Sequence, residues 1–141
     1  SSDLTQEDSL LKGVGDGLPA LMRAQKIQKK AKSIGFDWQA PEPAAGKVKE
    51  ELAELLEALQ EGPVRTEEEA GDLLFAAVNV VRLCGVHAET ALMAACEKFI
   101  RRFRAMEQAA VRSGITLSSQ TLETLDGLWE ETKRLEKQEK A

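Results

Sequence analysis

Sulfur and imidazole ligands are scarce in this sequence. Its 141 residues include two cysteines, Cys84 and Cys96, and a single histidine, His87. The cysteines form no CxxC pair, which argues against a disulfide framework and against a structural zinc site. Cysteine usage of this kind is typical of a reducing compartment, so we expect the protein to be cytoplasmic.

Long apolar runs and an excess of positive charge are also missing. The longest apolar run, residues 73–81, is interrupted by Asn79 and falls far short of the roughly 20 residues that a membrane helix needs. The 24 acidic residues outnumber the 19 basic ones, and the formal net charge is -5. This balance argues against binding to nucleic acid or to an anionic membrane, and we expect neither partner.

Glycine and proline separate long stretches rich in Ala, Leu, Glu, Lys and Arg, which predicts an all-α protein. Residues 1–17 contain three glycines and little apolar periodicity, so we expect a loose leader. Residues 18–138 are predicted to form one domain, a bundle of four to five helices. With a loop over residues 36–46, the predicted helices cover residues 19–35, 47–60, 66–84, 88–112 and 121–137.

The predicted second helix carries acidic residues beside an apolar stripe. At about 100° per residue, Glu51 lies at the edge of the stripe formed by Val48, Leu52, Leu55, Leu56 and Leu59. Glu54 lies one step further round, and Glu50 points mostly away from the stripe. By pattern alone, an ordinary amphipathic helix with a solvated acidic face accounts for these positions.

The predicted third helix is apolar on nearly every side, so we expect it to be surrounded by protein. Its polar exceptions before Arg82 are Glu69, Asp72 and Asn79, which fall within a strip about 80° wide. Buried carboxylates need cations, which either Arg and Lys or a metal ion can supply. A capping box in which Glu69 bonds the Thr66 backbone is an alternative for Glu69, but it leaves Asp72 and Asn79 unexplained.

The short Gly62-Pro63 link predicts that these two helices are antiparallel neighbours. The Glu51 and Glu54 edge would then face Glu69 and Asp72, so that four carboxylates converge. Because such a site is all oxygen, we expect Mg2+ or Mn2+ rather than zinc or copper. A di-iron site would need Glu-x-x-His motifs, and the sequence has none.

The predicted fourth helix carries a basic pair, Lys98 and Arg102, which share a face at i and i+4. Cations beside a carboxylate cluster suit a polyphosphate ester. A solvated basic face that pairs with nearby glutamates is an equally simple interpretation of the spacing.

The acidic pattern resembles that of a known family. Glu50-Glu51-x-x-Glu54, followed after fourteen residues by Glu69-x-x-Asp72, is similar to the EExxE and ExxD signature of the MazG family, which belongs to the all-α nucleoside triphosphate pyrophosphohydrolases. The resemblance extends over residues 18–135. Flanking stretches that also look like the catalytic half of MazG lie at residues 18–30, 35–38, 67–76 and 97–103.

The resemblance implies Mg2+-dependent hydrolysis of a nucleoside triphosphate to its monophosphate and pyrophosphate, with water attacking the α-phosphorus, in nucleotide-pool housecleaning. The implied metal ligands are Glu51, Glu54, Glu69 and Asp72. Lys98 and Arg102 match residues that contact the triphosphate and stabilise the leaving group, and Asn79 and Trp129 match residues of the substrate site. Family members form tight dimers of interlocked helices, so the resemblance also implies a homodimer.

Several assignments stay open. Glu50 and Glu54 are both candidates for the general base, and Glu50 is preferred because it is not needed as a metal ligand. Trp38 and Trp129 are the candidates for stacking on a nucleobase, with core packing as the alternative for each. The competing function is a non-catalytic helical dimerisation module, in which the acids are solvated or pair with the basic residues of 98–104.

Overall fold

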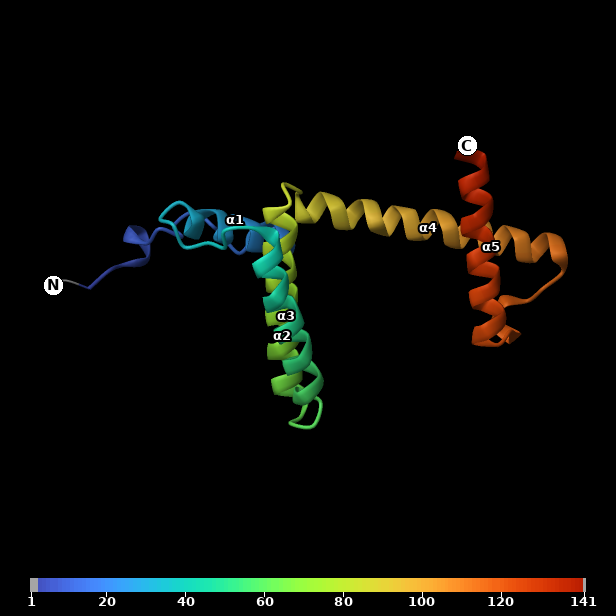
Figure 1. Ribbon diagram of the computed structural model, residues 1–141, viewed down its shortest axis with the longest axis horizontal. Coiled ribbons are helices and arrows are strands. Elements are labelled where there is room, and N and C mark those ends of the chain that lie inside the picture. The colour runs from blue at the N-terminus through green and yellow to red at the C-terminus, as the bar shows by residue number, and fades with distance from the viewer. Residues whose placement is uncertain (1–2, 141) are drawn as a thin grey trace. The chain divides into compact units, whose positions relative to one another are not determined.

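A computed structural model describes residues 3–140 and confirms the all-α class (Figure 1). Within these residues there are five α-helices, two short 3-10 helices, η1 (Gln6–Asp8) and η2 (Leu117–Ser119), and no strand. The α-helices are α1 (Ala20–Lys32), α2 (Pro41–Ala58), α3 (Pro63–Leu83), α4 (Ala88–Ser113) and α5 (Leu122–Lys140).

The chain groups into two compact units, which divide between Ala91 and Leu92. The first unit contains α1, α2 and α3, and the second contains most of α4 together with α5. The predicted division into a leader over residues 1–17 and a domain over residues 18–138 stays a prediction. Residues 1 and 2 of that leader lie outside the described residues.

Helices α2 and α3 form the antiparallel pair that the Gly62-Pro63 link predicts, and they lie side by side in Figure 1. The turn between them depends on Gly62, whose φ of 99° lies in the region that favours glycine. The exact helix starts were predicted wrongly, because α2 begins at Pro41 rather than residue 47, and α3 begins at Pro63 rather than residue 66. Proline has no N–H to donate, and the first helical turn does not need one.

Small side chains are buried on both helices. Ala44 and Ala58 of α2 are each 1% exposed, and Ala76 and Val78 of α3 are also buried. The expectation that α3 is surrounded by protein is not met within the single chain, because Leu74 and Phe75 remain 61% and 41% exposed.

Two buried glutamines attach α1 to the rest of the first unit. Gln28 Nε2 donates to the carbonyl oxygen of Phe75 at 3.0 Å. Gln25 accepts from the backbone N–H of Ala88 at 2.8 Å and donates to the Val86 carbonyl oxygen at 3.3 Å. Hydrogen bonds of this kind satisfy polar side chains that would otherwise be costly to bury.

The second unit has its own contacts between α4 and α5. The rings of Phe99 and Trp129 pack with centroids 5.1 Å apart, and Arg102 Nε lies 2.8 Å from Glu136 Oε2. Met106 and Ala110 of α4 and Thr132 of α5 are buried. Among residues 3–140, no single helix has the length and apolar character of a membrane span, and α3 and α4 meet that criterion only when taken as a pair.

Candidate functional site

Three of the four predicted ligand carboxylates form a cluster between α2 and α3. Glu51, Glu69 and Asp72 each place a carboxylate oxygen so that all three atoms lie within 4.8 Å of one another. Glu51 and Glu69 are only 6% and 5% exposed, whereas Asp72 is open to solvent. The cluster therefore has a buried base and an accessible side.

Each buried glutamate of the cluster pairs with a cation from the preceding turn of its own helix. Lys47 Nζ lies 3.0 Å from Glu51 Oε1, and Arg65 Nη2 lies 2.7 Å from Glu69 Oε1. The hydrogen bond from Lys47 lowers the pKa of Glu51 more than burial raises it. These cations were not considered in the sequence analysis, although the i, i+4 spacing of both pairs is visible in the sequence.

The capping-box alternative for Glu69 is wrong. Gly62, not Thr66, occupies the N-cap position of α3. The Thr66 hydroxyl lies 2.8 Å from the Gly62 carbonyl oxygen and 3.1 Å from that of Ala58, so it acts as a donor within the turn. Glu69 is therefore available to the cluster.

Two buried oxygen atoms in the cluster have no hydrogen-bond partner among the described residues. They are Oε2 of Glu51 and Oε2 of Glu69. An unsatisfied buried acceptor is costly, and a carboxylate oxygen more so. Oxygen atoms of this kind, in a site without nitrogen or sulfur ligands, fit a hard divalent cation. A divalent metal ion thus fits the residues present.

The remaining acids of the EExxE pattern differ in their surroundings. Glu54 is half-buried, and its pKa is raised, first by repulsion from the Glu51 charge and then by burial. Repulsion from Glu69 contributes as well, so Glu54 senses the cluster electrostatically. Glu50 is exposed, and its closest cation is Lys47 at 3.4 Å.

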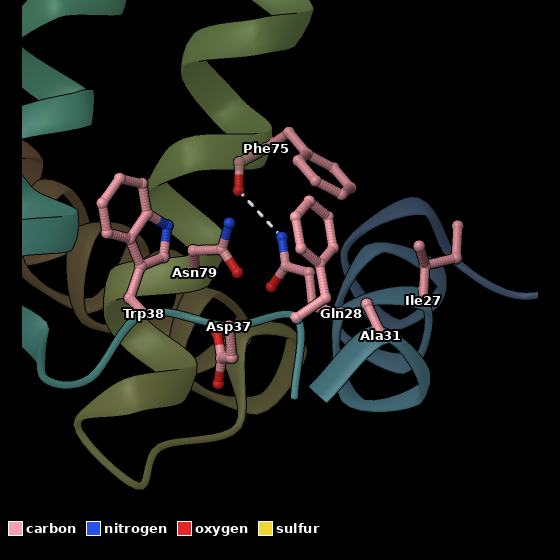
Figure 2. A pocket seen from close by; sticks show the side chains of 8 residues that line it. Ile27, Gln28, Ala31, Asp37, Trp38, Phe75 and Asn79 are labelled. Carbon is pink, nitrogen blue, oxygen red and sulfur yellow. Dashed lines mark hydrogen bonds between the residues drawn. The ribbon is translucent and has the colours of Figure 1, made fainter. Parts of the chain in front are cut away.

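A cavity of about 420 Å³ lies between α1, α3 and the connection from α1 to α2. Two predicted substrate residues, Trp38 and Asn79, line it (Figure 2). The other lining residues are Ile27, Gln28, Ala31, Phe36, Asp37 and Phe75. Three aromatic rings and a few polar groups are the kind of lining that small-molecule sites show.

Arg82 is the centre of a polar network behind this cavity, and the sequence analysis missed its role. Its guanidinium donates to both carboxylate oxygens of Asp37, at 2.6 and 3.0 Å. It also donates to Asn79 Oδ1 at 2.9 Å and to Gln28 Oε1 at 3.3 Å. The Arg82 side chain is 4% exposed. Its hydrogen bonds lower the pKa of Asp37 more strongly than burial raises it.

The predicted triphosphate-binding residues and Trp129 belong to the second unit. Lys98 is exposed, whereas Arg102 is half-buried and bonded to Glu136. Hydrogen bonds from Arg102, and then from Lys140, lower the pKa of Glu136 to about 2. Trp129 is half-buried, and its ring centroid lies 5.1 Å from that of Phe99. The proposed site residues are thus divided between the two units, and their roles stay predictions.

Comparison with known proteins gives a family match over the region that holds the acidic cluster. Residues 39–106 match the family model described as MazG nucleotide pyrophosphohydrolase domain. This range includes all of α2 and α3 and the first part of α4. It therefore contains Glu51, Glu54, Glu69 and Asp72.

Curated relatives extend the similarity over most of the chain. A protein of Escherichia coli (strain K12), named nucleoside triphosphate pyrophosphohydrolase, is 44% identical over 133 residues, which cover 92% of this chain and 51% of that protein. A Thermotoga maritima protein, named nucleoside triphosphate pyrophosphohydrolase/pyrophosphatase MazG, is 45% identical over 116 residues, which cover 82% of this chain and 45% of the relative. The uncharacterized protein YabN of Bacillus subtilis is 42% identical over 135 residues and is covered to 28%. The chain thus spans about half the length, or less, of these relatives.

Proposed function

Through residues 39–106 the chain belongs to the MazG nucleotide pyrophosphohydrolase family, and on that premise we propose that it hydrolyses nucleoside triphosphates to monophosphate and pyrophosphate. One observation carries the proposal. The acidic cluster of Glu51, Glu69 and Asp72 leaves two buried carboxylate oxygens without partners, which supports a bound divalent metal ion and with it metal-dependent phosphate chemistry. In this proposal the protein acts in nucleotide-pool housecleaning in the cytoplasm.

The proposed metal ligands are Glu51, Glu54, Glu69 and Asp72, and the proposed ion is Mg2+, with Mn2+ as the alternative. The proximity of three of these carboxylates and the electrostatic coupling of Glu54 to Glu51 support this set. When bound, the ion supplies neutralisation of the triphosphate charge and a lowered pKa of bound water.

The other residues of the site bind the nucleotide and handle the proton. Lys98 and Arg102 contact the triphosphate and stabilise the charge that develops as pyrophosphate departs. Asn79, Trp38 and Trp129 contact the nucleoside. Glu50 and Glu54 remain the candidates for accepting the proton of the water that attacks the α-phosphorus. Glu50 is favoured, because it is exposed and lies outside the cluster.

The proposed assembly is a homodimer. The apolar side chains that the first unit leaves open support it, since Leu56 of α2 and Leu74 of α3 are 58% and 61% exposed. A second copy of the chain is the partner that family membership suggests, and its helices would cover these side chains.

The decisive experiment is a panel of canonical and modified nucleoside triphosphates with Mg2+, in which both pyrophosphate and phosphate are measured. We expect pyrophosphate and the monophosphate from the wild-type chain, and neither from Asp72→Asn. Glu57→Gln is the matched control, because Glu57 is an exposed acid of α2 outside the cluster. Release of phosphate instead of pyrophosphate would show that the proposed reaction is wrong. If the protein responds to neither metal nor nucleotide, the result would favour the non-catalytic dimerisation module.

A further inference from the structure

Two side-chain donors at the cavity beside α3 have no hydrogen-bond partner among the described residues, Nδ2 of Asn79 and the indole Nε1 of Trp38. The polar atoms of Gln28 serve Phe75 and Arg82, and both oxygens of Asp37 accept from Arg82. Asn79 accepts from Arg82 through Oδ1, but its Nδ2 donates to no described residue. The cavity is otherwise walled by the rings of Phe36, Trp38 and Phe75.

Arg82 determines which way the Asn79 amide faces. A guanidinium group only donates hydrogen bonds, so the atom of Asn79 that lies 2.9 Å from Arg82 Nη2 must be the oxygen. The opposite atom is therefore the amide nitrogen. In Figure 2 this nitrogen is turned away from Asp37 and lies between Trp38 and Gln28. Because Arg82 is itself held by Asp37 and Gln28, the amide is not free to rotate.

The cavity is in reach of the acidic cluster. Asp72 and Asn79 are seven residues apart on α3, which places them on nearly the same face and about 10 Å apart along the helix axis. A nucleotide whose phosphates lie at the cluster can reach the cavity with its base. Three aromatic rings suit the faces of such a base, and the Asn79 amide faces one of its edges.

We propose that Arg82 is a positioning residue that makes Asn79 a hydrogen-bond donor to the nucleobase, so that this pocket favours a base with a carbonyl oxygen at that edge over its amino counterpart. This inference rests on the proposed function. A carbonyl oxygen accepts from Asn79 Nδ2, whereas an amino group places two donors against each other and leaves both without a partner.

Matched nucleotides test the inference by binding alone, without hydrolysis. Inosine and adenosine 5′-monophosphates exchange a carbonyl oxygen for an amino group at one base position, and so do the uridine and cytidine 5′-monophosphates. In both pairs the adjacent ring nitrogen carries a proton only in the carbonyl member. Binding is measured by isothermal titration calorimetry on the wild-type chain and on each variant, so that no residue of the proposed nucleoside site is replaced in the background. We expect the carbonyl member of each pair to bind about tenfold more tightly, which corresponds to about 1.4 kcal/mol. Equal affinities within both pairs would overturn the inference.

Asn79→Asp is the most direct test, because it changes the group that faces the base and retains the acceptor that faces Arg82. One aspartate oxygen still accepts from Arg82, and the other presents an acceptor to the cavity. The preference should therefore reverse in favour of adenosine and cytidine monophosphates. A preference for the carbonyl base that survives in Asn79→Asp would show that another group recognises the base edge.

Arg82→Lys tests the positioning role directly. An ammonium group can still pair with Asp37, but it lacks the planar fork that holds Asp37 and Asn79 at once. With its amide free to turn, Asn79 can offer either its oxygen or its nitrogen to the base. The ratio of the two affinities within each nucleotide pair should therefore fall towards one. Circular dichroism establishes that the variant is folded, and Asn79→Asp decides alone if it is not. Unchanged discrimination in folded Arg82→Lys would overturn the role of Arg82.

Failure of this inference can be told apart from failure of the proposed function. Pyrophosphate release by a protein that does not discriminate within the nucleotide pairs would reject the inference and leave the function standing. Discrimination that reverses in Asn79→Asp, without any pyrophosphate release, would support the inference for binding and reject the proposed reaction.

Discussion

At the residue scale, Glu51 and Glu69 each use one carboxylate oxygen for a cation of their own helix and leave the other oxygen without a partner. The two ion pairs lie within α2 and within α3, so neither connects the helices at this point. Two buried carboxylates that face each other across a helix pair repel. The cluster therefore lowers the local stability of the metal-free protein. Binding of a cation at the cluster should restore that stability.

Glu69→Gln tests this balance. We expect Mg2+ to stabilise the wild-type chain by about 2.7 kcal/mol at a hundred times its dissociation constant, which raises the melting temperature by roughly 5–10 °C. Glu69→Gln should lose most of that shift, while its metal-free form is at least as stable as the wild type, because a repelling charge is removed. Thermal unfolding with Mg2+ or with chelator measures both quantities. Glu67→Gln, at an exposed position of α3, should behave as the wild type does.

Glu136 gives a prediction about acid stability. Arg102 and Lys140 lower its pKa from 4.5 to about 2, so the folded protein favours the ionised form more than the unfolded chain does. A lowered carboxylate pKa adds stability that is complete above about pH 4.5 and is lost as the pH falls through about 2. The stability difference between wild type and Glu136→Gln should therefore shrink over that range in urea unfolding. A constant difference down to pH 2 would contradict the role of Arg102.

At the element scale, the turn between α2 and α3 determines which residues face each other in the cluster. Gly62 adopts a positive φ, Pro63 begins α3, and the Thr66 hydroxyl lies close to the carbonyl oxygens of Ala58 and Gly62. The carbonyl of Ala58 ends α2 and that of Gly62 precedes α3. One side chain thus joins the two helix termini.

Thr66→Val should weaken this connection between the end of α2 and the start of α3. The variant keeps the shape of threonine and removes the hydroxyl donor, so the carbonyl oxygens of Ala58 and Gly62 keep only their backbone N–H partners. We expect a loss of about 1–2 kcal/mol in the free energy of unfolding, measured in urea. Thr66→Ser retains the hydroxyl and should lose less. Equal losses in the two variants would mean that the methyl group, not the hydroxyl, matters.

The helices could be predicted from the sequence, but the two starts that involve proline could not. Pro41 and Pro63 were treated as breakers, although proline fits the first turn of a helix as readily as it ends one. The acidic cluster could be predicted because its residues lie on two helices joined by a four-residue link. The pairing of Arg82 with Asp37 could not, because 45 residues separate the partners and no local pattern joins them. The spacing of residues along the sequence predicts contacts between helices that follow each other in the chain. It does not predict ion pairs between residues that are far apart in sequence.

At the scale of the whole molecule, the first unit leaves large apolar side chains open on the same helices that hold the cluster. Leu52, Leu56 and Leu74 are 46%, 58% and 61% exposed. The family match extends from residue 39 to residue 106 and so crosses the boundary between the two units.

Leu74→Lys tests that association. Leu74 is mostly exposed in the single chain, so a lysine there should not disturb the chain's own packing. In a dimer that buries this position, the charge would be costly, and we expect the dimer to dissociate at least tenfold more readily. Light scattering coupled to size-exclusion chromatography measures the mass. Val111→Lys, at a position of α4 that is 74% exposed, is the control. A monomeric wild type would contradict the proposed homodimer.

The Arg82 network has a consequence for the folding pathway. Arg82 contacts Gln28 and Asp37, which are 54 and 45 residues away in sequence, so its hydrogen bonds close long loops. Closing long loops is entropically costly, and such contacts tend to form after local helical ones. The network should therefore be absent from the folding transition state. In stopped-flow measurements, Arg82→Lys should speed unfolding and leave the folding rate nearly unchanged, so that the wall of the pocket is completed only after the helices have formed.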